Sequence, residues 1–249
     1  MEKLIYAIVQ PLTDVYAINL LLSGIPGVSE TNLYALFYND IAVVVSDGVI
    51  LNEFVKKEMA IDFARVIESL SQQLTLLPVR FDSLLPSDAE ATRLLSQNYT
   101  AFRNNLDNVK NKFEFGLKVL WDYEKGIEKV KINMESANEN TNNCITSSSI
   151  HANYLLKKIK ENKLDNALRD YIEQLKKEFV HDIAIINPEY NFNKMITANL
   201  ILDGVFLVDK SKKYEFIQAV GNFKKNHTEL HFLLTGPWPP YSFVVCPMV

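Results

Sequence analysis

Two histidines near the C-terminus form the group of side chains that comes nearest to a metal site. His227 and His231 stand four residues apart. On a helix this spacing would place both imidazoles on one face, where they could share an ion. On a strand, which the sequence indicates from Glu229 onward, they would stand roughly 13 Å apart at about 3.3 Å per residue. We therefore expect polar residues at the entrance of a strand and no metal site.

Arg80 is the other side chain that could bind a charged group. It lies in the segment 77–81, where alternating apolar residues would share one face of a strand and Arg80 would point to the other. Two roles are open: a contact with an anion or a partner protein, or an ion pair with Asp82 or Asp88 across a partly buried surface. We favour the ion pair, because neither a glycine-rich loop nor a second basic residue accompanies the arginine.

The remaining reactive side chains form no recognisable catalytic group. Cys144 lies in a polar loop and Cys246 near the C-terminus, and neither belongs to a Cys-x-x-Cys pair. The sequence has no Gly-x-Ser-x-Gly elbow or dinucleotide-binding pattern, and it contains only 8 glycines. We therefore predict no catalytic residue, no cofactor and no enzymatic activity. The alternative is an enzyme or small-ligand-binding protein on the same scaffold, since one fold can serve unrelated functions.

The segment 236–244, with the sequence Gly-Pro-Trp-Pro-Pro-Tyr-Ser-Phe-Val, is unusual for a chain end. Its prolines cannot donate to a sheet, so we expect the chain to leave the sheet after a last strand at 230–234. Its large side chains are typical of a segment that docks, either on a partner or on the tail's own second domain, which we favour. The candidate partner-binding residues are Arg80, Trp238, Pro239, Pro240, Tyr241 and Phe243.

Composition limits the class of protein further. Hydrophobic residues make up 48% of the chain and charged residues 22%, so a packed core is expected. The net charge of −4 argues against a general binder of nucleic acid or of anionic membranes. No apolar run approaches the ~20 residues that span a bilayer, and no export signal is recognisable. We expect a protein made in the cytoplasm.

The elements that must position these side chains fall into two similar series. In the first, a strand at 4–9 is followed by a helix ending near Leu22, a hairpin of strands at 32–38 and 41–46, a helix at 53–71 and a strand at 75–81. One long helix at 87–109, opened by a Ser87–Glu90 capping box, completes a predicted first domain at 1–110.

The second series spans 111–249. It has a strand at 113–121, a polar tract at about 134–149 that is a flexible loop or a fraying helix end, and a long helix at 150–179. A hairpin around Asp203-Gly204, a helix capped by Ser211 and the last strand follow. Both series read β-α-β-β-α-β. The predicted fold is therefore α+β, with two ferredoxin-like (βαββαβ) domains, the second enlarged by a long helix and closed by the C-terminal tail.

Three segments of the chain resemble one known family. They are Leu77-Pro78-Val79-Arg80-Phe81, Val205-Phe206-Leu207-Val208-Asp209 and Gly236-Pro237-Trp238-Pro239-Pro240-Tyr241-Ser242-Phe243. In order and spacing they resemble the gas vesicle protein GvpF/GvpL family, and most of all its GvpF members. The third is the most specific of the three. Asp82 departs from the pattern, in which a glycine is expected after Arg-Phe, and this leaves the local turn open.

The resemblance implies a minor, non-enzymatic component of gas vesicles, the gas-filled protein shells of buoyant microorganisms. Members are thought to bind the small hydrophobic shell protein GvpA and to assist vesicle nucleation or assembly, including by preventing its aggregation. Other gas vesicle accessory proteins are further expected partners, and nucleic acid and lipid membrane are not. The expected location is the gas vesicle. The family brings no catalytic residues.

Overall fold

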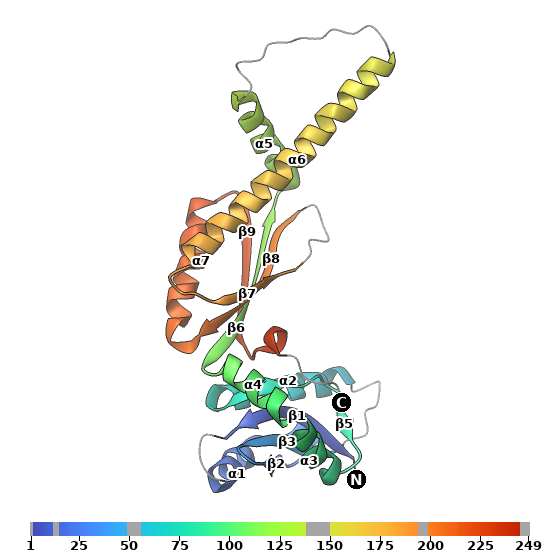
Figure 1. Cartoon of the computed structure of the whole chain (residues 1–249), viewed down its shortest axis with the longest axis vertical. Helices are drawn as coiled ribbons and strands as arrows, with labels where there is room; N and C mark the ends of the chain where they lie inside the picture. Colours follow the sequence, from blue (N-terminus) through green and yellow to red (C-terminus); the bar gives the residue numbers. More distant parts are fainter. Residues whose placement is uncertain (1, 12–14, 49–55, 138–149, 194–198, 245–249) are drawn as a thin grey trace. The chain divides into compact units, whose positions relative to one another are not determined.

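The computed structural model describes residues 2–11, 15–48, 56–137, 150–193 and 199–244 (Figure 1). These residues form an α+β fold with two sheets. The chain divides into two compact units, one of Met1–Phe115 with Gly236–Val249 and one of Gly116–Thr235. The expected division at residue 110 placed the tail with the second domain, whereas the contacts group it with the first unit. Cys144, Cys246 and most of the predicted polar loop lie outside the described residues.

The first unit contains a sheet of five strands. Its elements are β1 (Lys3–Gln10), α1 (Val15–Ser23), η1 (Val28–Glu30), β2 (Tyr34–Tyr38), β3 (Ile41–Asp47), α2 (Lys56–Gln73), β4 (Thr75–Pro78), β5 (Leu84–Leu85), α3 (Asp88–Gln97) and α4 (Tyr99–Val109). The strand order is β2-β3-β1-β4, and β5 also pairs with β1. All of these pairs are antiparallel.

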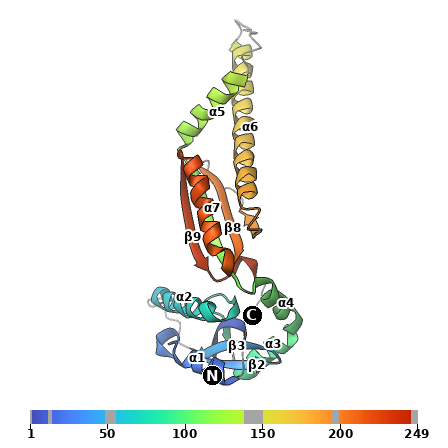
Figure 2. The ribbon, with the colours of Figure 1, turned by 90° about the vertical axis from the view of Figure 1, so that its left-hand side faces the viewer.

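Helices cover both faces of this sheet. Figure 2 shows α1 and α2 on one side and α3 and α4 on the other. The six central residues of β1 and the first six of β3 are accordingly all buried. The ring of Tyr6 in β1 stacks on Phe63 of α2, with centroids 5.0 Å apart. Its buried hydroxyl accepts a hydrogen bond from the backbone N–H of Val28 at 2.9 Å, so the polar end of this core residue is satisfied.

Two expectations for the first unit were wrong in detail. The long helix expected at 87–109 is two helices, separated at Asn98, whose φ of −115° and ψ of 14° are not helical. The strand expected at 75–81 ends at Pro78, and a turn follows in which Asp82 has φ of 75°. The hairpin is confirmed, since Tyr38 pairs with Ile41 across a two-residue turn that contains Asn39 at φ of 53°.

The second sheet has the order β7-β8-β6-β9. Its elements and those between them are β6 (Lys112–Trp121), α5 (Tyr123–Ala137), α6 (Ile150–Asp182), β7 (Glu189–Phe192), β8 (Leu200–Asp209), η2 (Lys210–Lys212), α7 (Lys213–Asn226) and β9 (Leu230–Trp238). Helices α6 and α7 contact each other and β8. Beneath them the ring of Phe206 in β8 packs against Phe179 and Phe216, at centroid distances of 5.6 and 5.4 Å.

The hairpin expected around Asp203-Gly204 is wrong. Strand β8 runs straight through these residues, and one of its two neighbours in the sheet is the antiparallel strand β7, which the sequence did not predict. Gly204 has a packing role instead, because a Cβ there would lie 2.9 Å from the ring of Phe192. Helix α5 was not predicted either.

Two predicted ends of elements also differ. Ser211, the expected cap, is itself held by Asp209. Oδ1 of Asp209 accepts hydrogen bonds from the backbone N–H of Ser211 at 2.8 Å and from the Ser211 hydroxyl at 2.6 Å. Strand β9 continues to Trp238 rather than ending near residue 234. Proline has no N–H to donate to a neighbouring strand, but an edge strand tolerates this because one of its sides is unpaired. Pro237 therefore does not terminate the strand.

Candidate partner-binding site

The C-terminal tail after β9 is partly buried and partly exposed. Pro239 and Pro240 are buried, and the short turn η3 (Tyr241–Phe243) follows them. Trp238 and Tyr241 each keep 45% of their surface exposed, and Phe243 is half-buried. Five of the six predicted residues therefore lie together in one segment of the first unit, and the two largest of them remain accessible.

Glu114 at the start of β6 anchors this tail. The residue is 6% exposed. Its Oε2 accepts a hydrogen bond from the backbone N–H of Ser242 at 2.7 Å, and its Oε1 accepts one from the Ser242 hydroxyl at 2.8 Å. Burial raises the pKa of the Glu114 carboxyl, and the two bonds from Ser242 oppose that rise. Sequence reasoning missed this residue, although a carboxylate between Phe113 and Phe115 in a strand was a signal.

The path of the tail past Glu114 requires a glycine. Gly236 has φ of +105°, a conformation that residues with a Cβ rarely adopt. A Cβ there would also lie 2.7 Å from the backbone oxygen of Glu114. Further along, burial and the carboxylates of Glu114 and Glu68 raise the pKa of Tyr241 to about 12, although much of the ring is exposed. The tail is thus fitted to its own unit rather than loosely attached.

Arg80 does not join this segment. It lies in the turn after β4, with its side chain 82% exposed, and its Nε is 3.5 Å from Oδ1 of Asp82. The predicted pairing with an acidic neighbour is therefore present, but at the surface and not across a partly buried one. An exposed pair of this kind contributes little to stability.

His227 and His231 lie in different surroundings. Nε2 of His227 lies 3.0 Å from Oε1 of Glu178 on α6, and its ring packs against Phe223. His231 is exposed on β9. Among the described residues no group of three or more histidine, cysteine or acidic side chains could hold a metal ion. No described helix combines the length and apolarity needed to cross a membrane.

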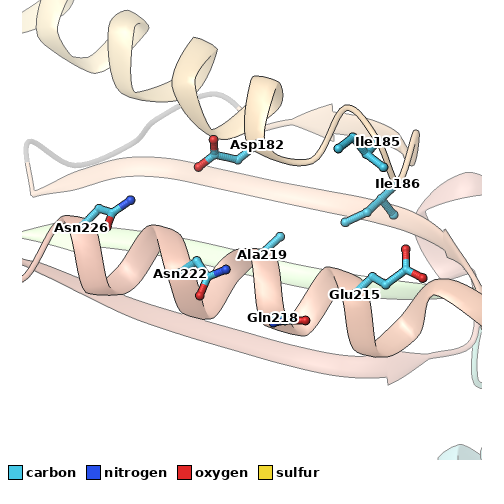
Figure 3. A pocket seen from close by; sticks show the side chains of 8 residues that line it. All are labelled: Asp182, Ile185, Ile186, Glu215, Gln218, Ala219, Asn222 and Asn226. Carbon is cyan, nitrogen blue, oxygen red and sulfur yellow. The ribbon is translucent and has the colours of Figure 1, made fainter.

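A groove between α6 and α7 is a second candidate site, which sequence reasoning did not foresee. It has a volume of about 380 Å³, and Figure 3 shows its lining side chains. Glu215 stands near one end and Asn226 near the other, with Asp182 between them on the side of α6. The amides of Gln218 and Asn222 also come from α7, and Ile185, Ile186 and Ala219 add apolar surface. Within the described parts of the chain neither carboxylate has an ion-pair partner.

Comparison with known proteins places this architecture in a family. The family model described as gas vesicle synthesis protein GvpL/GvpF matches residues 3–245. Gas vesicle protein F1 of Halobacterium salinarum is 22% identical over 224 residues, which cover 89% of this chain and 84% of that protein. Gas vesicle protein L1 of the same organism is 23% identical over 233 residues, covering 87% and 82% respectively.

Solved structures show the same fold. The crystal structure of the gas vesicle protein GvpF from Anabaena sp. PCC7120 matches with a TM-score of 0.72 at 16% identity, covering 97% of this chain and 95% of that one. GvpF from Microcystis aeruginosa also matches with a TM-score of 0.72, at 15% identity, covering 97% and 98%. Because the family model spans nearly the whole sequence, this chain belongs to the gas vesicle GvpL/GvpF family.

Proposed function

We propose that this protein is a minor, non-catalytic component of gas vesicles that binds the shell protein GvpA and assists vesicle nucleation or assembly. The observation that carries the proposal is the family match over residues 3–245. Other gas vesicle accessory proteins are further proposed partners, and the vesicle, assembled inside the cell, is the proposed location. Nothing in the proposal requires nucleic acid, a lipid membrane or a cofactor.

Physical chemistry gives a reason for such a helper. A shell subunit that keeps water away from one face must expose apolar surface before assembly, and exposed apolar patches aggregate. A folded binder can cover that surface until the subunit joins the shell. This protein keeps Trp238 and Tyr241 accessible on a tail that is fixed by Ser242 and Glu114, so little entropy would be lost when they bind.

We also propose that each unit is a variant of the ferredoxin-like fold. Each has a βαββαβ series in its larger elements and a strand order of second, third, first, fourth. In the second unit two helices, α5 and α6, stand where the first has α1. This proposal keeps the predicted fold for both domains, with the tail reassigned to the first.

The test is co-purification of tagged protein with GvpA expressed in the same cells. The wild-type protein should retain GvpA, and complete failure to do so would refute the proposed function. The double variant Trp238→Ala, Tyr241→Ala should retain less if the tail contacts the partner. Tyr214→Ala on α7 is the matched control, because this tyrosine is 78% exposed and lies outside the tail. If both variants retain GvpA equally well, the tail is not part of the binding surface.

A further inference from the structure

Strand β2 forms one edge of the first sheet, outside β3 (Figure 1). Its residues pair with β3 on one side only, from Tyr34 opposite Val45 to Tyr38 opposite Ile41. In an antiparallel pair successive residues direct their N–H and C=O groups alternately toward the partner strand and away from it, so about half of these groups point outward. In the described part of the chain, none of the outward groups of β2 has a backbone hydrogen-bond partner.

The edge of β2 also lacks the features that normally prevent strand pairing, such as proline, charge, a bulge or very short length. Its sequence is Tyr-Ala-Leu-Phe-Tyr, and its register with β3 is unbroken. The other described edge strands differ. Strand β4 has four residues and ends in Pro78, β5 has only two residues, β7 has four residues and begins with the charged Glu189, and β9 contains Pro237. Only β2, among these five, presents an unprotected edge.

On one face of the sheet the surface beside β2 is apolar and uncharged, while on the other face the charged helix α3 packs against it. Helix α1 contacts β2 and lies next to it in both views of the ribbon (Figures 1 and 2). It contains no charged residue, and it exposes 77% of Tyr16 and 64% of Leu20, which stand one helical turn apart. A strand added outside β2 would therefore lie next to an exposed apolar helix surface.

Three carboxylates near the two ends of β2, those of Asp47, Asp88 and Asp40, are already partnered. Nζ of Lys3 lies 2.6 Å from Oδ1 of Asp47, and the hydroxyl of Tyr34 donates to Oδ1 of Asp88 at 2.8 Å. Beyond the other end, Nε of Arg103 lies 2.8 Å from Oδ2 of Asp40. A charged side chain arriving along β2 would lose water without gaining a free opposite charge there, so the edge selects an uncharged strand.

From these observations we propose that β2 is a strand-addition site, at which an extended, uncharged and apolar segment of the shell protein pairs with Tyr34–Tyr38 and lies along α1. Main-chain hydrogen bonds supply affinity in this mode of recognition, and the flanking side chains supply selectivity. The inference rests on the proposed function and names the surface that performs it.

The first experiment screens overlapping synthetic peptides that cover the GvpA sequence against the full-length protein. One uncharged, apolar peptide should bind and should slow hydrogen exchange at the amides of residues 34–38. N-methylation of alternate residues of that peptide should weaken binding at least tenfold in one register and leave it nearly unchanged in the other, because only alternate amides face β2. Equal loss in both registers, or protection only at 215–226 or 238–244, would overturn the proposal.

The second experiment alters the protein. Ala35→Pro and Leu36→Pro each remove one N–H of β2, and alternation means that one of these faces outward and the other faces β3. The outward variant should keep a wild-type melting temperature and retain GvpA at least tenfold less well, while the inward variant should melt lower. Leu233→Ser, an exposed position on β9, is the control and should retain GvpA normally.

The outcomes separate the two proposals. If wild-type protein retains no GvpA and binds none of its peptides, the proposed function and the strand-addition site both fail. If wild-type protein retains GvpA and the folded proline variant retains it equally, the site at β2 is wrong and the proposed function stands. If the proline variant instead changes only the association of the protein with itself, the edge serves a second copy of the chain, and the proposal is overturned.

Discussion

The two sheets of this protein have the same strand order but are buried in different ways. Counted along the chain, each runs second, third, first, fourth. In the first sheet the inner strands β1 and β3 each have six consecutive buried residues, whereas along β9, an edge strand of the second sheet, half-buried and exposed residues largely alternate. Helices cover both faces of the first sheet, while the contacting helices α6 and α7 lie over one face of the second. The burial pattern therefore depends on the place of a strand in its sheet and on the faces that helices cover, and not on how the strands connect.

The connections after the first strand of each sheet differ as much as the faces do. In the first unit the nine-residue α1 leads toward β2, while the second unit has α5 with 15 residues and α6 with 33 residues before β7. A 33-residue helix is about 50 Å long at 1.5 Å per residue, far more than a sheet of this size can cover. The same strand order is therefore compatible with a short or a very long connection between the first and second strands of a sheet.

The sharpest test of the comparison places a lysine in each sheet. Val43 in β3 is fully buried, and Leu233 in β9 is 53% exposed. Val43→Lys should lower the free energy of unfolding by about 5 kcal/mol or more, because the charge has no water and no partner. Leu233→Lys should change it by no more than about 0.5 kcal/mol. Urea unfolding measures both, and similar losses would show that the second sheet is covered on both faces after all.

A pair of glycine variants tests whether the tail belongs to the first unit. Gly236→Ala forces a Cβ into a positive-φ position against the backbone of Glu114 and should cost about 1–3 kcal/mol. Gly204→Ala meets the rings of Phe192 and Phe206 and no backbone atom, so its cost should be smaller. Hydrogen exchange should show the effect of Gly236→Ala in the first unit. An effect confined to residues 116–235 would contradict the grouping of the tail.

The pH dependence of stability tests the buried anchor. Because burial raises the pKa of Glu114 above its ordinary value of 4.5, the native chain keeps this proton at a pH where the unfolded chain has lost it. The stability contributed by Glu114 is therefore present below pH 4.5 and falls as the pH rises through the native pKa, by at most about 1.4 kcal/mol per pH unit. Glu114→Gln should fold, and its stability should lack this fall with rising pH. If the variant shows the same fall, the pH dependence comes from other groups.

The smallest expected effect concerns the turn after β4. Asp82 has φ of 75°, which glycine adopts without strain, and its ion pair with the exposed Arg80 is weak. Asp82→Gly should therefore leave the melting temperature unchanged or raise it slightly, by the equivalent of about 0.5 kcal/mol. Asp82→Val is the matched control and should lower it. A clear loss of stability in Asp82→Gly would give the carboxylate a structural role.

Local patterns predicted the elements whose signals lie within a few residues. The first strand, the hairpin with Asn39 in its turn and the capping bond from the N–H of Glu90 to the hydroxyl of Ser87 follow from the sequence and are present. The errors arose where a distant residue decides the local structure. Gly204 looked like a turn residue, but it lies within a strand against Phe192. A glycine needed for close packing cannot be told from one needed for a turn by its neighbours alone.

The α+β class, the division in two parts, the buried strands, the family and the unusual aromatic tail all follow from the amino-acid sequence, because each depends on a short-range pattern or a specific motif. Where the tail packs does not follow from it and depends on long-range contacts. Its partner, Glu114, is 128 residues away from Ser242, and no local preference couples the two. The tertiary structure likewise decided that β2 is an edge, because a strand's place in a sheet depends on which strands pair with it and not on its own residues.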